Sequence, residues 1–292
     1  MIASLGAAQP NPPPTPRAYL PIVLHDAMTA TVYFAVIGDY GLAGAGELAV
    51  ANLVKGWNPD FIITTGDNNY DVGSATTIDA NIGQYYQGFI YPYVGSYGPG
   101  ATTNGFFPSL GNHDWYAAGA TPYLDYFTLP GNERYYDFTW GPVRLFAVDS
   151  DPNEPDGTAS NSVQAAWLQS GLTTSSGCWN LVYFHHPPYS SGPHESDARM
   201  QWPYQAWGAD AVLSGHDHDY ERIVLNGFPY FVNGLGGKSI YAFGPPVTDS
   251  QVRYNATFGA MLIVASSTAI TFQFVATDGA VVDTYALSGG CS

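Results

Sequence analysis

The chain has 292 residues with 46% hydrophobic residues, enough apolar material to form one large domain or two small ones. Its formal net charge of −16 argues against nucleic acid or an anionic membrane as a partner, because both require a basic protein face. Charged residues make up only 11% of the chain and just two are lysines, Lys55 and Lys238, a composition typical of a secreted or periplasmic protein.

The N-terminal stretch differs from the rest of the chain. Six prolines favour an extended backbone there: Pro10, Pro12, Pro13, Pro14, Pro16 and Pro21. We therefore expect residues 1–30 to be a leader or strap and residues 31–292 to be the catalytic domain. The sequence has no apolar run of about 18 residues, so it predicts no membrane-spanning segment.

From residue 31 onward, β-rich runs alternate with helical patterns, as in α/β layers. Strands are predicted at residues 31–37, 61–65, 180–184 and 209–213. Helices are predicted at residues 46–55, 76–87, 163–170 and 197–207. After residue 218, the pattern predicts a second, largely antiparallel sheet from strands near 221–225, 229–233, 259–265, 270–276 and 280–286.

Polar motifs follow the first four strands or lie between them. They are Gly38-Asp39-Tyr40-Gly41, Gly66-Asp67-Asn68-Asn69-Tyr70, Gly111-Asn112-His113-Asp114, His185-His186-Pro187, His194 and Gly215-His216-Asp217-His218. Any one of them alone would predict a turn or a helix cap. Because strands of α/β folds present chemistry at their carboxyl ends, we expect these side chains to meet at one rim. Together they offer the oxygen and imidazole donors that two adjacent hard cations require.

In this order the motifs resemble those of the calcineurin-like metallophosphoesterases and, within them, the small mammalian-type purple acid phosphatases. The resemblance covers roughly residues 31–286. Most members of that superfamily open with Asp-x-His, whereas here Gly41 stands two residues after Asp39 and cannot bind a metal. Tyr70 stands where the purple acid phosphatases place a tyrosinate that binds ferric iron. The missing histidine and the added tyrosine support each other.

The resemblance implies a dinuclear centre of Fe(III) with Fe(II), Zn(II) or Mn(II). The first ion would be bound by Asp39, Asp67, Tyr70 and His218. The second would be bound by Asp67, Asn112, His185 and His216, with Asp67 as the bridge. His185 aligns with the family's ligand, and His186 is interpreted as a neighbour that binds no metal, although an exchange between these tandem histidines stays open.

The resemblance also implies an α/β fold, a four-layer α-β-β-α sandwich of two mixed sheets flanked by helices. Its expected activity is that of an acid phosphatase acting on small-molecule phosphate monoesters, with a hydroxide activated at the metal centre and a histidine as general acid. His113, oriented by Asp114, and His194 are the candidates for that acid. Two alternatives stay open: a metallophosphodiesterase or nucleotide-cleaving enzyme on the same scaffold, and a secreted iron-binding protein without turnover.

Two further features each leave two interpretations. Cys178 and Cys291, the two cysteines, predict a disulfide that ties the C-terminal tail to the domain, or two free thiols in a reducing compartment. An aromatic segment either packs a long loop onto the core, which we favour, or walls the substrate pocket. Its members are Tyr85, Tyr86, Phe89, Tyr91, Tyr93 and Tyr97.

Overall fold

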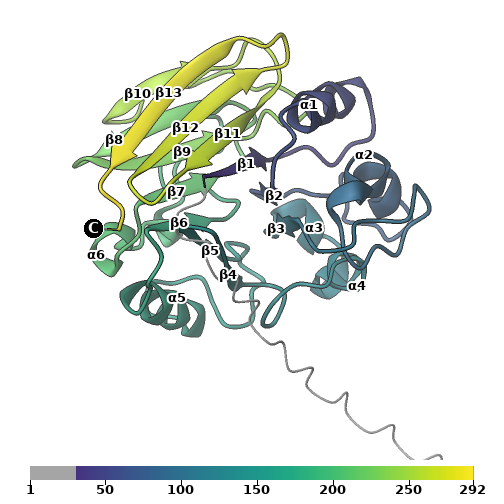
Figure 1. Cartoon of the computed structure of the whole chain (residues 1–292), viewed down its shortest axis with the longest axis horizontal. Coiled ribbons are helices and arrows are strands. Elements are labelled where there is room, and N and C mark those ends of the chain that lie inside the picture. Colours follow the sequence, from purple (N-terminus) through teal and green to yellow (C-terminus); the bar gives the residue numbers. More distant parts are fainter. Residues whose placement is uncertain (1–30, 292) are drawn as a thin grey trace, which may run out of the picture.

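Two mixed β-sheets form the centre of a computed structural model that describes residues 31–291 (Figure 1). The predicted leader at residues 1–30 lies outside the described residues. The first sheet has the order β13 (Val281–Ser288), β12 (Ala269–Ala276), β11 (Gly259–Ala265), β1 (Val32–Ile37), β2 (Phe61–Thr64), β3 (Phe106–Pro108). The second has the order β10 (Ser250–Tyr254), β8 (Tyr220–Leu225), β9 (Phe228–Asn233), β7 (Ala211–Ser214), β6 (Trp179–Tyr183), β5 (Val143–Ala147), β4 (Tyr136–Trp140).

The strands after residue 218 do not form a sheet of their own, so that part of the prediction is wrong. The strand β11 pairs antiparallel with β1, and β12 and β13 extend that sheet. In contrast, β9 pairs parallel with β7, and β8 and β10 continue the second sheet. A period-two pattern of side chains predicts a strand, but it does not predict which other strand, distant in the sequence, that strand pairs with. The strands β3, β4, β5 and β10 were also missed.

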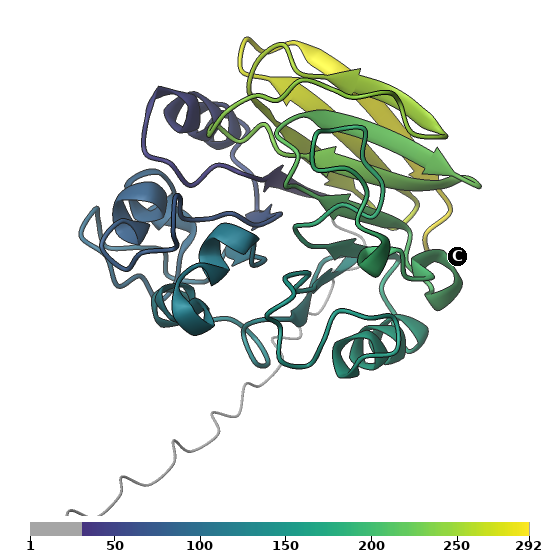
Figure 2. The ribbon, with the colours of Figure 1, turned by 180° about the vertical axis from the view of Figure 1, so that it is seen from behind.

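Side chains alternate between two hydrophobic cores along the second sheet. Leu181 and Tyr183 on β6 point into the core between the sheets, whereas Val182 and Phe184 point into a second core beneath helix α5 (Val163–Thr173). Helix α1 (Ala45–Gly56) covers the first sheet through its buried side chains. Figure 2 shows α1 and α5 on opposite sides of the paired sheets. The predicted four-layer α/β fold is therefore confirmed.

The helices match the prediction unevenly. The predicted helices at 46–55 and 163–170 are α1 and α5, and Ser162 caps α5 by accepting a hydrogen bond from the Ala165 N–H. The predicted helix at 197–207 is instead a 3₁₀ turn (Ala198–Met200) and α6 (Tyr204–Trp207), because Pro203 has no N–H and disfavours a helical residue before it. The predicted helix at 76–87 is a π turn (Asp79–Gly83), α2 (Gln84–Tyr86) and a 3₁₀ turn (Gln87–Phe89).

The remaining helices lie in loops that the sequence left unassigned. They are α3 (Asn112–Trp115), a 3₁₀ turn (Ala118–Ala120) and α4 (Thr121–Tyr126). In the aromatic segment, Tyr85 and Tyr86 are buried in the main core and Phe89 and Tyr93 pack against it. These contacts favour the packing interpretation of that segment.

Cys178 and Cys291 form a disulfide, as predicted. It joins the tail after β13 to the residue before β6. Within residues 31–291, no helix combines the length and the apolar character needed to cross a bilayer.

Candidate metal centre

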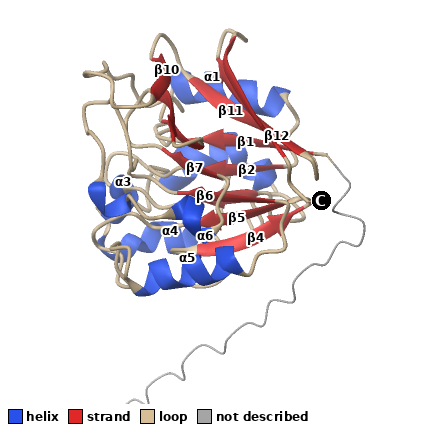
Figure 3. Cartoon of the chain, turned by 90° about the vertical axis from the view of Figure 1, so that its left-hand side faces the viewer, coloured by secondary structure: helices blue, strands red, loops and turns tan. Residues whose placement is uncertain are grey.

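The predicted site residues come from both sheets and meet at one end of them. Asp39 follows β1, Asp67 follows β2, His185 follows β6 and His216 follows β7, each two or three residues beyond the end of its strand. In Figure 3 the loops gather at one end of the strands, where α3 also lies, and α3 begins at Asn112. The strand ends therefore bring together residues that are far apart in the sequence.

Three candidate ligands of the first metal form one group. The Tyr70 hydroxyl lies 3.2 Å from Asp39 Oδ1 and 3.2 Å from His218 Nε2. His218 Nε2 lies 3.4 Å from Asp39 Oδ1. All three side chains are buried. A phenol oxygen, a carboxylate oxygen and an imidazole nitrogen thus face one another at one point.

The candidate ligands of the second metal form an adjacent group around His185. Its Nε2 atom lies 2.9 Å from Asn112 Oδ1, 3.0 Å from His216 Nδ1 and 3.4 Å from Asp67 Oδ1. The charge of Asp67 also acts on the first group, where, after burial, it helps to raise the pKa of the Tyr70 phenol. Its carboxylate therefore lies next to both groups, as expected of a bridge.

The hydrogen bonds around His185 fit a cation at this point. Its Nδ1 atom lies 2.9 Å from the Thr65 carbonyl oxygen, which can only accept, so Nδ1 carries the proton and Nε2 presents a lone pair. Burial, followed by the neighbouring His186, lowers the pKa of His185 well below its usual value, which keeps the ring neutral. The lone pair on Nε2 faces acceptor oxygens of Asn112 and Asp67. A cation among these atoms would turn their mutual repulsion into attraction.

The acidic groups of the site lead to the same conclusion. Burial and then the charge of Asp67 raise the pKa of Asp39 well above its usual value. Burial and then Asp67 and Asp39 also raise the pKa of the Tyr70 phenol. Two buried carboxylates beside a phenol are costly to ionise unless positive charge is supplied. A divalent or trivalent ion supplies that charge, so the donor set fits a dinuclear centre.

Unusual backbone geometry positions these side chains. Asp39, Asp67 and His216 have φ angles of 56°, 54° and 71°, in the left-handed region, which costs about 1–3 kcal/mol for each such residue. Close approach explains the glycine at position 66, because a Cβ atom there would lie 2.7 Å from His185 Nδ1. The glycine of the Gly-Asp motif after β2 thus permits the turn and leaves room for the His185 ring that packs against it.

Position 41, where most of the superfamily has histidine, has no room for a side chain. A Cβ atom on Gly41 would clash with the Asn68 carbonyl group and lie 2.6 Å from Asn69 N. The Gly41 carbonyl accepts a hydrogen bond of 2.8 Å from the Tyr70 N–H. The loop that carries Tyr70 therefore occupies the space that a histidine at 41 would need.

The two candidate general acids lie on the same rim. His113 Nε2 is 3.9 Å from Asp67 Oδ2, and the His194 ring centroid is 4.2 Å from that of His216. The predicted role of Asp114 is wrong, because the Asp71 carbonyl oxygen, 2.6 Å from Nδ1, orients the His113 ring. Asp114 is the third residue of α3, and its side chain instead caps the start of that helix. It accepts hydrogen bonds from the Gly111 N–H and from Asn68.

One further segment touches the site and was not found in the sequence. Ser239 Oγ lies 2.6 Å from His218 Nδ1, and the Tyr241 ring stacks on His218 at 4.1 Å. Lys238 Nζ lies 4.6 Å from the Tyr70 ring centroid and 2.6 Å from Asp71 Oδ1. The signal available was the run Gly236-Gly237-Lys238-Ser239, which begins three residues after the end of β9 and resembles the other Gly-rich turns at strand ends.

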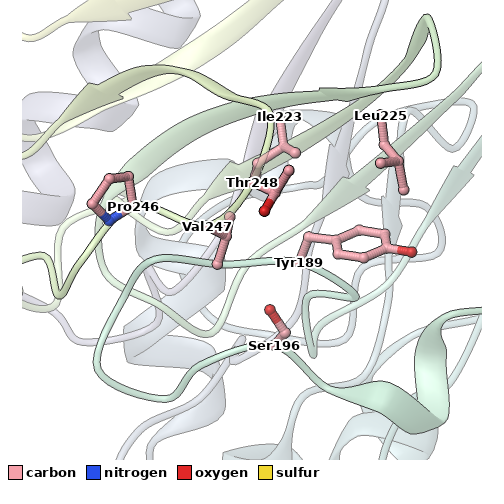
Figure 4. A pocket seen from close by; sticks show the side chains of 7 residues that line it. All are labelled: Tyr189, Ser196, Ile223, Leu225, Pro246, Val247 and Thr248. Carbon is pink, nitrogen blue, oxygen red and sulfur yellow. The ribbon is translucent and has the colours of Figure 1, made fainter.

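A pocket of about 420 Å³ lies elsewhere, between the segment that carries His194 and strand β8 (Figure 4). Figure 4 shows Tyr189 and Val247 among its mostly apolar lining. None of the candidate metal ligands lines this pocket. The convergence of donors at the strand ends, rather than this pocket, therefore locates the chemistry.

Residues 32–220 match the calcineurin-like phosphoesterase family, and the chain belongs to that family. The prediction of a phosphoesterase enzyme is confirmed. The match covers the strands β1 to β7, after which the candidate ligands Asp39, Asp67, His185 and His216 are placed.

Within that family the relatives are purple acid phosphatases, as the resemblance predicted. Purple acid phosphatase 17 of Arabidopsis thaliana is 26% identical over 256 residues, which cover 75% of this chain and 72% of the relative. The tartrate-resistant acid phosphatase type 5 of Mus musculus is 26% identical over 252 residues, covering 75% of this chain and 76% of the relative.

Two solved structures share the fold. Purple acid phosphatase PPD1 from yellow lupin (Lupinus luteus) seeds superposes with a TM-score of 0.73 at 18% identity, over 90% of this chain and 55% of that one. GAP50, described as the anchor in the inner membrane complex of Plasmodium, has a TM-score of 0.69 at 20% identity, over 88% of this chain and 89% of that one. At these identities both support the fold alone.

Proposed function

We propose that this protein is an acid phosphatase that hydrolyses small phosphate monoesters at a dinuclear Fe(III)–M(II) centre, in which M is Fe, Zn or Mn. The observation that carries the proposal is the pair of adjacent donor groups that share Asp67, one of which contains a tyrosine. Phenolate and carboxylate oxygens suit a hard trivalent ion, whereas the amide and imidazoles of the second group suit a divalent one.

Seven residues would hold the two ions. Asp39, Tyr70 and His218 belong to the first, Asn112, His185 and His216 belong to the second, and Asp67 belongs to both. When bound, the ions would neutralise charge on the phosphoryl group and lower the pKa of a water so that it attacks phosphorus. Asp39, Asp67 and a Tyr70 phenolate would together contribute three negative charges, which leaves the site positive for a phosphate ester.

The protein's own histidines would complete the reaction. A departing alkoxide or phenoxide needs a proton, and an imidazole can supply it at acidic to neutral pH. His113 is anchored by the Asp71 carbonyl, and its other nitrogen faces the rim beside Asp67. His194 is exposed and lies over His216. We propose these two as the candidates for the general acid, with His113 on the side of the first ion and His194 on the side of the second.

The test is the visible spectrum of concentrated, aerobically purified protein, together with turnover of p-nitrophenyl phosphate and bis(p-nitrophenyl) phosphate. A tyrosinate bound to ferric iron gives a charge-transfer band that zinc and manganese do not. Loss of that band in Tyr70→Phe, with monoester favoured over diester, would support the proposal. A colourless, metal-replete protein would refute the iron assignment. Preferred diester turnover would favour a phosphodiesterase, and a coloured protein without turnover would favour an iron-binding protein.

We also propose that the protein works outside the cytoplasm, in secreted or periplasmic form. The disulfide between Cys178 and Cys291 supports this, because disulfides persist in oxidising compartments. Fractionation of the producing cells, followed by assay of the medium or periplasm, would test it.

A further inference from the structure

The tandem histidines His185 and His186 have different hydrogen-bond partners at the same ring atom. The Nδ1 atom of His185 faces a backbone carbonyl oxygen, that of Thr65. The Nδ1 atom of His186 faces a hydroxyl, Ser150 Oγ, at 2.9 Å. A carbonyl can only accept a hydrogen bond, whereas a hydroxyl can also donate one. The two rings can therefore carry their protons on opposite nitrogens.

The hydrogen bonds of Ser150 decide which nitrogen of His186 carries the proton. Ser150 is buried, and its Oγ already accepts a hydrogen bond of 2.9 Å from the His186 backbone N–H. Its own O–H therefore needs an acceptor, since a buried unpaired donor is costly. Among residues 31–291, the one acceptor within reach of that O–H is His186 Nδ1. In the neutral ring Nδ1 then accepts, and the proton is on Nε2.

The His186 ring lies against the second group of metal ligands. Its centroid is 4.5 Å from that of His216 and 5.0 Å from that of His185. A ring nitrogen of His186 lies within 4.8 Å of a ring nitrogen in each of them. The side chain is only 9% exposed, and within the described part of the chain Nε2 has no hydrogen-bond partner. His186 Nε2 is not among the buried polar atoms that lack a partner, so this N–H donor reaches solvent, on a ring that lies beside the proposed ligands of the second metal.

We propose that His186 is a further substrate-binding residue, which donates a hydrogen bond from Nε2–H to a non-bridging oxygen of the phosphoryl group. Its ligand class is a tetrahedral oxyanion. This inference rests on the proposed function, because it places the phosphoryl group beside the second metal. With the proton on Nε2, that nitrogen has no lone pair for a metal, which separates His186 from the ligand His185. Preorganised N–H donors of this kind stabilise phosphoryl oxygens without moving in the reaction.

The test measures binding of inorganic phosphate to the metal-loaded protein by calorimetry, which needs no turnover. His186→Leu keeps an apolar side chain of moderate size and removes the donor, whereas His186→Gln retains an N–H. We expect the leucine variant to bind phosphate roughly 10- to 100-fold more weakly, the range for losing a hydrogen bond to a charged group. The glutamine variant should recover most of that loss, and both should hold two metals per chain with unchanged visible absorption.

Ser150→Ala provides an independent test that leaves the His186 ring in place. Without the hydroxyl donor, the proton is free to move to Nδ1, so phosphate binding should weaken although metal content stays the same. If His186→Leu does not fold, Ser150→Ala is compared with the unmodified protein instead. Loss of the second metal in His186→Leu would show that His186 is a ligand and would overturn the inference. Phosphate binding equal to that of the unmodified protein in both variants would overturn it as well.

The outcome can be distinguished from a failure of the proposed function. That function fails if the unmodified, metal-replete protein does not turn over monoesters or lacks the iron band. The role of His186 fails if phosphate affinity does not follow the presence of the N–H donor. Both results come from separate measurements on the same preparations.

Discussion

Gly41→Ala tests whether the loop that carries Tyr70 requires an empty position at residue 41. The added methyl group would clash with the Asn68 carbonyl and approach Asn69 N at 2.6 Å. Both contacts are backbone atoms, which cannot rotate away, so the loop from Asp67 to Tyr70 must shift. Overpacking of this kind costs about 1–3 kcal/mol of the free energy of unfolding.

Gly56→Ala is the matched control for Gly41→Ala. Gly56 ends α1, and a Cβ atom there would meet no atom within 4 Å. Alanine in a helix is favoured over glycine by roughly 0.5–1 kcal/mol, so this variant should become slightly more stable. The two variants should therefore differ by roughly 1.5–4 kcal/mol in the free energy of unfolding.

The assay is urea denaturation of the metal-free proteins followed by tryptophan fluorescence, with a metal titration of each variant. Because Asp67 and Tyr70 belong to the displaced loop, Gly41→Ala should also bind iron more weakly than Gly56→Ala does. Gly41→His, which restores the Asp-x-His motif of the superfamily, should be at least as destabilised and should not add a ligand. A Gly41→Ala protein with unchanged stability and unchanged iron affinity would refute the reasoning.

Four further predictions concern other parts of the molecule. Replacing whichever of His113 and His194 is the general acid by Asn should lower kcat for monoesters by ~10² or more, and unchanged kcat in both variants would remove that role. Lys238→Met should move the tyrosinate band to longer wavelength, because the ammonium that lies over the Tyr70 ring stabilises charge on the phenolate, whereas Lys238→Arg should largely preserve the band. Replacing Cys178 and Cys291 by Ser should lower the free energy of unfolding by up to ~5 kcal/mol, because the disulfide closes a loop of 113 residues, and denaturation with and without reductant should show the difference. Burial, with Asp217 and then Glu221, raises the pKa of Asp219 from 3.8 to about 8, so between these pH values the folded metal-free protein retains a proton that the unfolded chain loses. The contribution of this group to stability should therefore fall as pH rises through that interval, and Asp219→Asn should flatten the fall.

The sequence alone determined the family, the candidate ligands and most of the strands. Asp39, Asp67, His185 and His216 were predictable because each comes directly after an apolar run, and strand ends of an α/β fold lie at one edge. Tyr70 became a candidate because the resemblance to the purple acid phosphatases implies a tyrosinate at this place, and Gly41, where most of the superfamily has histidine, agrees with it. With two cysteines in the chain, any disulfide within it had to join Cys178 to Cys291, but whether that bond forms was left open by the sequence and decided by the structure. These features depend on local pattern or on order along the chain.

Only the tertiary structure decided the features that depend on which distant atoms touch. The division of β8 to β13 between two sheets, the hydrogen bond from Asn68 to Asp114 and the contacts of Lys238, Ser239 and Tyr241 with the site all arise between segments far apart in the sequence. The difference between His185 and His186 is of the same kind. Adjacent identical residues have equal local propensities, and only their partners, Thr65 on one strand end and Ser150 on another, fix which nitrogen holds the proton.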